Sequence, residues 1–176
     1  AAAAGGRVVV LGAGLIGAEA ASGLRALGAE VVLVARNAVP LVPLVGPTMA
    51  AHLHAMHAAH GVEIVRGAVA AVRRGPVDRL AIELVDGRTI DATEVLAGVG
   101  CAPRTELAAA AGLEVDGGIV VDAAGRTSAP RIYAGGDATR LRRADGGLAP
   151  LAGHWEAAQL DGRAIAAAIL GAEPPT

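Results

Sequence analysis

The sequence has few aromatic or reactive side chains. Its 176 residues include one Cys, one Trp, one Tyr and no Phe, and all 15 basic residues are Arg. Because Cys101 stands alone, an internal disulfide, a Cys-x-x-Cys redox pair and a Cys-based zinc or iron–sulfur site built by this chain are excluded. We expect Cys101 to be a small packing residue. Any redox chemistry must therefore come from an organic cofactor or a partner.

The sequence also lacks an excess of one charge and a long apolar run. The basic residues face 17 acidic ones, which leaves a net charge of -2 and a pI near 6.2, so no global field favours nucleic acid or anionic lipid. Mean hydropathy is +0.51, but no stretch of about 18 apolar residues, as a membrane span needs, is free of Gly, Pro, His or charge. Residues 1–7 have no secretory pattern. A cytoplasmic protein with no membrane and no nucleic-acid partner is expected.

Small apolar residues are abundant. Hydrophobic residues make up 53% of the chain, and 25 residues are Gly, which excludes intrinsic disorder and supports a real core. The first part alternates continuous apolar runs with segments of helical period, so it predicts β-α-β-α-β. The expected elements are strands at 7–11, 30–35 and 62–65 and helices at 15–27 and 48–59.

The period then changes. Short segments joined by Gly75-Pro76 and Asp86-Gly87 predict an antiparallel meander. The elements expected here are strands at 69–73, 80–85 and 89–90, a parallel strand at 94–97, a helix at 105–111, strands at 119–121 and 131–134, and a helix at 154–170. The predicted fold class is α/β, a Rossmann-like parallel sheet with helices on both faces and an antiparallel β-meander insertion.

A Gly-x-Gly-x-x-Gly motif lies between the first strand and the first helix, the context that gives this pattern its meaning. Gly12 permits the tight turn, Gly14 lets a pyrophosphate approach the backbone, and Gly17 lets the helix lie close to the sheet. Unpaired amides at the helix start, around Leu15 and Ile16, can then meet the phosphates. The alternative is a Gly-rich turn without a ligand.

The residues that end the second strand bear on the choice of nucleotide. In an NAD-binding unit an acid at this position accepts hydrogen bonds from the adenosine ribose. Here the position is Ala35, and Arg36 follows. Alanine cannot accept those bonds, whereas a guanidinium matches a 2′-phosphate. This favours NADP over NAD, with a solvated loop arginine as the alternative.

Five segments carry a family pattern over nearly the whole chain. They are GAGLIGAE between strand and helix, LVGPTMAAHLHAMHAAHGVEI, GVGCAPRTELAAAAGLEV, DGGIVVDAAGRTSAPRIYAGGDATR and HWEAAQLDG. Together they resemble the flavin-dependent pyridine-nucleotide oxidoreductases, most closely the ferredoxin and rubredoxin reductase branch. The resemblance implies an NAD(P)-binding domain at 1–112 and part of an FAD domain at 113–176. In that family Glu more often holds the position of Ala35.

The resemblance also implies flavin-side residues. The family aspartate that hydrogen-bonds the flavin ribityl chain matches Asp137, preceded by Gly136, and the His-Trp segment beside the isoalloxazine matches His154 and Trp155. The family's first FAD module, with its own Gly-x-Gly-x-x-Gly, has no counterpart here. The FAD site is therefore expected to be only partly present.

Two further segments are candidates on the nicotinamide side. Glu19 resembles a family glutamate near the nicotinamide, where it could orient the carboxamide; the alternative is a first-turn acid that favours the helix dipole. Gly98, Val99 and Gly100 follow a parallel strand, where Gly permits close approach of a ligand, with a plain loop as the alternative.

The implied function is transfer of hydride from NAD(P)H to FAD and of electrons to ferredoxin or a similar iron–sulfur protein. The alternative is a nucleotide-binding module or fragment without turnover. Self-association through exposed FAD-domain surface is a further expectation. Four histidines, His52, His54, His57 and His60, crowd one predicted helix, but no acid or Cys completes a ligand set. A solvated face is therefore predicted there, and no metal.

Overall fold

The computed structural model describes residues 6–37, 39–77, 79–151 and 153–172. The chain forms two compact units, Ala1–Gly100 (unit 1) and Cys101–Thr176 (unit 2), and each is described by itself. The resemblance places a domain boundary after residue 112, whereas the compact units divide after Gly100. The short helix α3 (Glu106–Ala110) accordingly belongs to unit 2.

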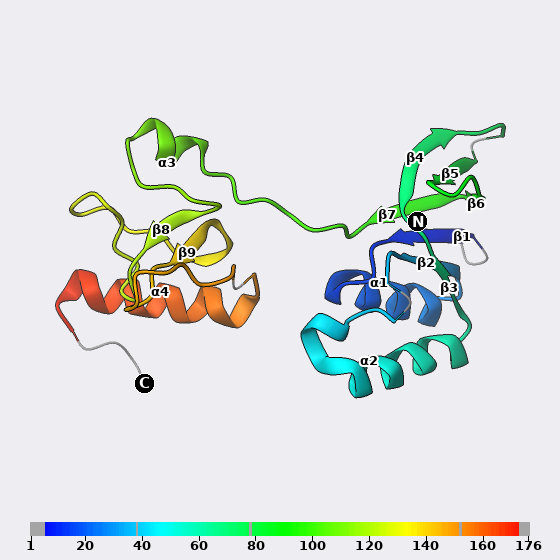
Figure 1. Cartoon of the computed structure of the whole chain (residues 1–176), viewed down its shortest axis with the longest axis horizontal. Helices are drawn as coiled ribbons and strands as arrows, with labels where there is room; N and C mark the ends of the chain where they lie inside the picture. Colours follow the sequence, from blue (N-terminus) through cyan, green and yellow to red (C-terminus); the bar gives the residue numbers. More distant parts are fainter. Residues whose placement is uncertain (1–5, 38, 78, 152, 173–176) are drawn as a thin grey trace. The chain divides into compact units, whose positions relative to one another are not determined.

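A four-stranded parallel sheet is the centre of unit 1 (Figure 1). Its strands, in the order β3-β2-β1-β7, are β3 (Val62–Arg66), β2 (Glu30–Ala35), β1 (Arg7–Leu11) and β7 (Glu94–Ala97). The two central strands are β-branched runs buried on both faces, as a covered parallel sheet requires. The Gly-rich turn follows β1, so it lies at the carboxyl edge of the sheet.

Different layers cover the two faces of this sheet. Helices α1 (Leu15–Ala26) and α2 (Val42–Ala59) lie on one side in Figure 1, where Val8, Val10, Val31 and Leu33 form a core with Ala21 of α1. On the other side lies the antiparallel meander of β4 (Val69–Arg74), β5 (Leu80–Leu84) and β6 (Thr89–Ala92).

The predicted parallel sheet and meander are confirmed, but the expected helices on the second face are not found among the described residues. The meander occupies that face because its alternating residues Ile82, Leu84 and Ala92 are apolar and pack on Val9 and Val32 of the sheet. A further difference concerns α2, which begins at Val42 instead of residue 48. Gly46 interrupts it with φ 75°.

Unit 2 is built on a short parallel pair and one long helix. Its elements after α3 are β8 (Ile119–Val121), the single-turn 3-10 helix η1 (Gly136–Ala138), β9 (Thr139–Leu141) and α4 (Trp155–Leu170). The strand predicted at 131–134 is wrong: Arg131 has φ 65°, and Tyr133 forms only an isolated bridge with Arg126. The pairing partner of β8 is instead β9.

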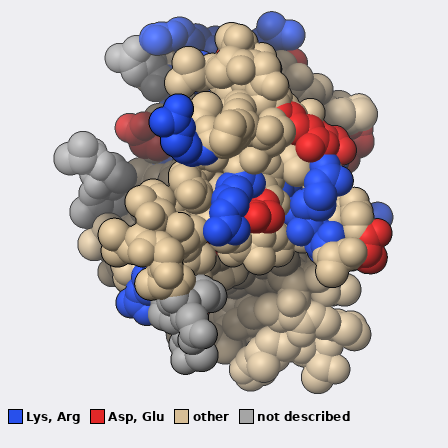
Figure 2. Space-filling model, turned by 90° about the vertical axis from the view of Figure 1, so that its left-hand side faces the viewer, with Lys and Arg blue, Asp and Glu red and all other residues tan. Residues whose placement is uncertain are grey.

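Charges on unit 2 are distributed in opposite pairs. Arg126 lies 3.4 Å from Asp122 and Arg143 lies 3.1 Å from Asp145, measured between the paired nitrogen and oxygen atoms. Figure 2 shows the basic and acidic groups interleaved on the face that it draws. Within the described ranges, every helix is too short or too polar to span a bilayer.

Candidate functional site

The turn between β1 and α1 is closed by backbone contacts that leave no room for side chains at two glycines. A Cβ on Gly12 would lie 2.4 Å from the carbonyl oxygen of Gly98, and Gly12 also has φ 94°. A Cβ on Gly17 would lie 1.9 Å from the carbonyl oxygen of Gly12. Glycine is therefore required at both positions by the packing of the turn itself.

The middle glycine is in a different situation. A Cβ built on Gly14 would meet nothing within 4 Å, and Gly14 precedes α1 with extended backbone (φ -74°, ψ -170°). The first hydrogen bond of the helix runs from the Ala18 amide to the Gly14 carbonyl. Among the described residues no group accepts from the amides of Leu15, Ile16 or Gly17, and no acid lies in the first turn. Unpaired amides and the positive end of a helix dipole are the chemistry that binding of an anion requires.

Gly98, Val99 and Gly100 lie beside this turn. The Gly98 amide donates to the Leu11 carbonyl at 2.8 Å, which extends the β1–β7 pairing by one residue and brings Gly98 against Gly12. Val99 and Gly100 are exposed, and Gly100 has φ 105°. The predicted nicotinamide-side loop thus begins at the Gly-rich turn.

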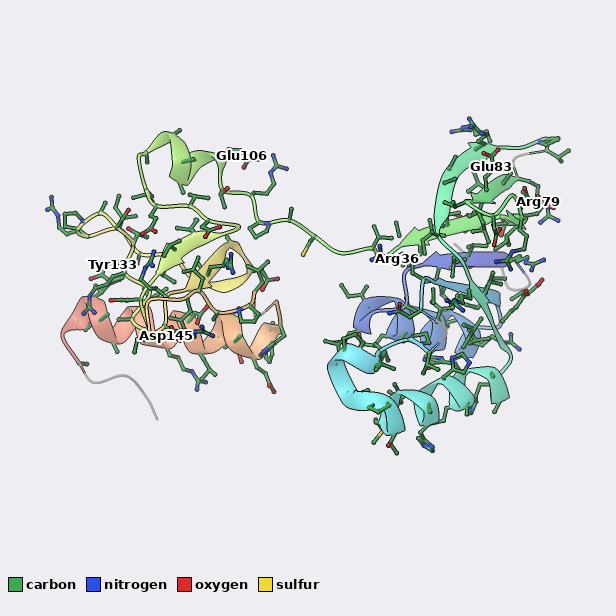
Figure 3. The ribbon with its side chains drawn as sticks, viewed as in Figure 1. Arg36, Arg79, Glu83, Glu106, Tyr133 and Asp145 are labelled. Atoms are coloured by element: carbon green, nitrogen blue, oxygen red, sulfur yellow. The ribbon has the colours of Figure 1, made fainter. Side chains whose placement is uncertain are left out.

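The end of β2 lies at the same edge of the sheet. Ala35 is 3% exposed and offers no side-chain acceptor, while Arg36 is exposed. Figure 3 shows Arg36 at the end of the sheet where α1 begins. None of the hydrogen bonds or ion pairs found among the described residues involves the Arg36 side chain.

A cavity of about 510 Å³ lies between α1 and α2 and includes Glu19 in its wall. Since α1 begins at Leu15, Glu19 is in its second turn, so the alternative of a first-turn acid is wrong. His57 is in the same wall; burial lowers its pKa below the ordinary value, and the charges of His54 and His60 lower it further. In the described parts of the chain, no cluster of three His, Cys, Asp or Glu could hold a metal ion.

Unit 2 contains a second cavity, of about 240 Å³, at the carboxyl ends of β8 and the start of η1. Gly136, Asp137 and Thr139 line it on one side, and Ala158 and Asp161 of α4 line it on the other. The predicted pair Gly136-Asp137 is thus at a hollow that a ligand could enter.

Sequence analysis missed Asp161, which holds this turn. Its Oδ2 accepts a hydrogen bond from the Gly136 amide at 2.9 Å, so α4 fixes the start of η1. The spacing of Ala158, Asp161 and Ile165 on one helical face was a usable signal. Asp122 also lines the cavity; burial opposes its ionisation, but hydrogen bonds from the amides of Arg126 and Ala124 hold its pKa below the ordinary value.

The remaining predicted residues lie at the start of α4 and at the first position of unit 2. His154 is the N-cap of α4, since its Nδ1 accepts from the Ala157 amide at 3.2 Å. Trp155 is 74% exposed. Neither belongs to the lining of the 240 Å³ cavity. Cys101 is exposed, so its expected role in packing is wrong.

Comparison with known proteins places these sites in context. The family described as pyridine nucleotide-disulphide oxidoreductase matches residues 2–162. The nitric oxide reductase FlRd-NAD(+) reductase of Aeromonas salmonicida is 38% identical over 170 residues, which are 96% of this chain and 42% of that protein. The ferredoxin--NAD(+) reductase component of the biphenyl dioxygenase system of Paraburkholderia xenovorans is 34% identical over 171 residues, 97% of this chain and 42% of that protein.

A solved structure shows the same likeness. In the crystal structure of the covalent putidaredoxin reductase–putidaredoxin complex, one chain matches with a TM-score of 0.88 and 32% identity, covering 97% of this chain and 42% of that one. The chain thus spans 42% of the length of each of these three proteins.

Proposed function

Because this chain belongs to the pyridine nucleotide-disulphide oxidoreductase family, we propose that it is the nucleotide-binding part of an FAD-dependent NAD(P)H oxidoreductase. The observation that carries the proposal is the contrast within the Gly-rich turn. Backbone atoms leave no room for a Cβ at Gly12 and Gly17, whereas a Cβ at Gly14, just before the helix begins, would meet nothing within 4 Å. The free space at Gly14, beside unpaired amides, suits a pyrophosphate. The packing of the turn itself does not require a glycine at this position.

Different residues at and around the Gly-rich turn would bind different parts of the nucleotide. The amides of Leu15, Ile16 and Gly17 would bind the pyrophosphate, and the exposed Val99–Gly100 segment would border the nicotinamide half. Glu19, in the second turn of α1, would orient the carboxamide. A bound nicotinamide supplies a hydride, so the contribution of the protein is position and electrostatics.

The choice between NADH and NADPH depends on the residues that meet the adenosine ribose of the nucleotide. The names of the two relatives specify NAD(+). In this chain, however, the residue at the end of β2 is a buried alanine followed by an exposed arginine. Arg36 can donate to a 2′-phosphate, and Ala35 cannot accept from ribose hydroxyls. We therefore propose that NADPH binds more tightly than NADH.

FAD would be held by unit 2 from one side. The 240 Å³ cavity with Asp137 in its lining is of a size and polarity for part of a flavin nucleotide. His154 and Trp155 closely precede Ala157 and Ala158, which line the cavity. The sequence has one Gly-x-Gly-x-x-Gly, which the nicotinamide nucleotide takes. Within the intact oxidoreductase, flavin chemistry would serve a ferredoxin-like iron–sulfur acceptor, as the ferredoxin reductase name of one relative suggests.

The exposed apolar side of α4 supports contact with another protein surface. Trp155, Leu160 and Leu170 are all largely exposed. Exposed apolar groups on one helix favour association with a partner chain or a second copy.

A nucleotide-binding module without turnover is the second candidate function. It is favoured because the sequence has one Gly-x-Gly-x-x-Gly motif and no second one.

Calorimetric titration with NADPH and NADH tests the proposal. Gly14→Val places a branched side chain in the open space, so NADPH binding should be lost while the protein stays folded. Gly23→Ala, an equally open glycine in the middle of α1, is the control and should bind as the unchanged protein does. Equal NADPH affinity for the Gly14→Val variant and the unchanged protein contradicts the proposed site.

A further inference from the structure

The carboxyl ends of β2 and β3 place an arginine beside the alanine that ends β2. Ala35 is the register partner of Arg66 in the parallel β2–β3 pair. The Gly67 amide donates to the Ala35 carbonyl at 2.9 Å, so the two strand ends stay paired to their last residues. Arg66 lies 31 positions after Ala35 in the sequence, and the strand pairing brings them together.

Alternation along the strands puts both side chains on one face of the sheet. Val62 and Ile64 pack with the core on the α1 side, so Arg66 belongs to that face. Leu33 packs in the same core, so Ala35, two residues further along β2, faces the same side of the sheet. A buried methyl group on β2 thus lies beside the strand end of β3 that carries an exposed arginine.

Three arginines of unit 1 are paired with acids and Arg25 donates to backbone carbonyls, whereas Arg66, like Arg36, Arg74 and Arg79, has no such partner among the described residues. Arg7, Arg73 and Arg88 pair with acids at 2.7 to 3.2 Å. The side chains of Arg66 and Arg36 are exposed, and within the described ranges no hydrogen bond or ion pair engages either. The Arg66 backbone is held, because Arg88 donates to its carbonyl.

We propose that Arg66 is a second specificity-determining residue, which together with Arg36 binds a phosphate dianion on the adenosine ribose of the nucleotide. The inference rests on the proposed nucleotide site at the Gly-rich turn. Two exposed guanidinium groups at the neighbouring ends of β2 and β3, on the edge next to that turn, suit a 2′-phosphate and offer nothing to a bare hydroxyl pair. Arg66 binds through charge; it takes no part in hydride transfer.

The test compares NADPH and NADH affinities by calorimetry for the unchanged protein and for Arg66→Ala, Arg66→Lys, Arg36→Ala and Arg79→Ala. Arg79 is an exposed arginine of the meander, and Figure 3 shows it at the opposite end of unit 1 from Arg36. A charge-assisted contact is worth about tenfold or more in affinity. Arg66→Ala should therefore weaken NADPH about tenfold or more and change NADH by less than about twofold. Arg66→Lys should restore part of the loss, and Arg79→Ala should change neither.

Each other outcome overturns a distinct claim. Equal weakening of both nucleotides by Arg66→Ala means that the guanidinium stacks on the adenine, which refutes phosphate recognition. NADPH binding unchanged in Arg66→Ala, with Arg36→Ala still weakened, removes Arg66 from the site and leaves the nucleotide proposal standing. Failure of both nucleotides to bind the unchanged protein refutes the nucleotide proposal itself.

Discussion

Replacing Gly17 with alanine should destabilise unit 1 more than any other single methyl group added to α1. The new Cβ would lie 1.9 Å from the Gly12 carbonyl oxygen, and contacts under 3.0 Å essentially never occur for a Cβ. The helix and the turn must therefore separate by about 1.1 Å, which close-packed surroundings resist. The Gly12 carbonyl oxygen belongs to the backbone, so no rotamer change relieves the clash.

The magnitude follows from two opposing effects. Overpacking of this kind costs about 3 kcal/mol, the upper end of the usual range, since the obstacle is rigid. Replacing helical glycine with alanine returns about 1 kcal/mol. The net loss of about 2 kcal/mol should lower the melting temperature of a unit of this size by roughly 8–16 °C. Gly23→Ala adds the same methyl to the same helix where nothing lies within 4 Å, and should keep or raise stability.

The assay must report on unit 1 alone. The chain has one Trp and one Tyr, Trp155 and Tyr133, and no Phe, so aromatic emission follows unit 2. Hydrogen exchange of peptides from β1 and α1 during a denaturant series measures unit 1 directly, and Trp155 emission serves as an internal reference that should not shift. A Gly17→Ala protein with protection in α1 equal to that of Gly23→Ala would refute the packing argument.

Two further results are expected. His57 has a lowered pKa in the folded chain and an ordinary pKa of about 6.5 when unfolded, so its contribution to stability is present above about pH 6.5 and is lost as the pH falls. Glu19, Arg25 and His60 line the same cavity, and the charge of His54 acts on His57 as well. The urea midpoint should fall between about pH 7.5 and about pH 5.5, and less so in His57→Gln; equal slopes for both proteins would exclude His57 as the cause. The purified chain should be colourless and should not reduce ferricyanide with NADPH, with or without added FAD. The reason is that a partial flavin site lacks several of the charge-assisted hydrogen bonds that hold the cofactor. A stoichiometric flavin absorbance band at about 450 nm together with turnover would contradict this prediction.

Features formed by residues that are close together in the sequence could be predicted from the sequence alone. The β1–turn–α1 unit, its three glycines and the exposed Arg36 all follow from residues 7–36, because strand, turn and helix are consecutive and each depends on local periodicity and backbone freedom. The meander was accessible for the same reason, through the Asp86-Gly87 turn signal. The strand predicted at 131–134 failed because three or four apolar residues do not distinguish a strand from a bent loop.

Features that join distant residues required the tertiary structure. The meander, not a helix, fills the second face of the sheet because Ile82 and Leu84 reach Val9 and Val32. The carbonyl of Gly98 closes on Gly12, Asp161 holds the Gly136 amide, and Arg66 comes beside Ala35. The sequence by itself determined which residue types were present for a nucleotide site. Strand register and helix packing decided which of them meet, since contacts between residues tens of positions apart depend on how whole elements align.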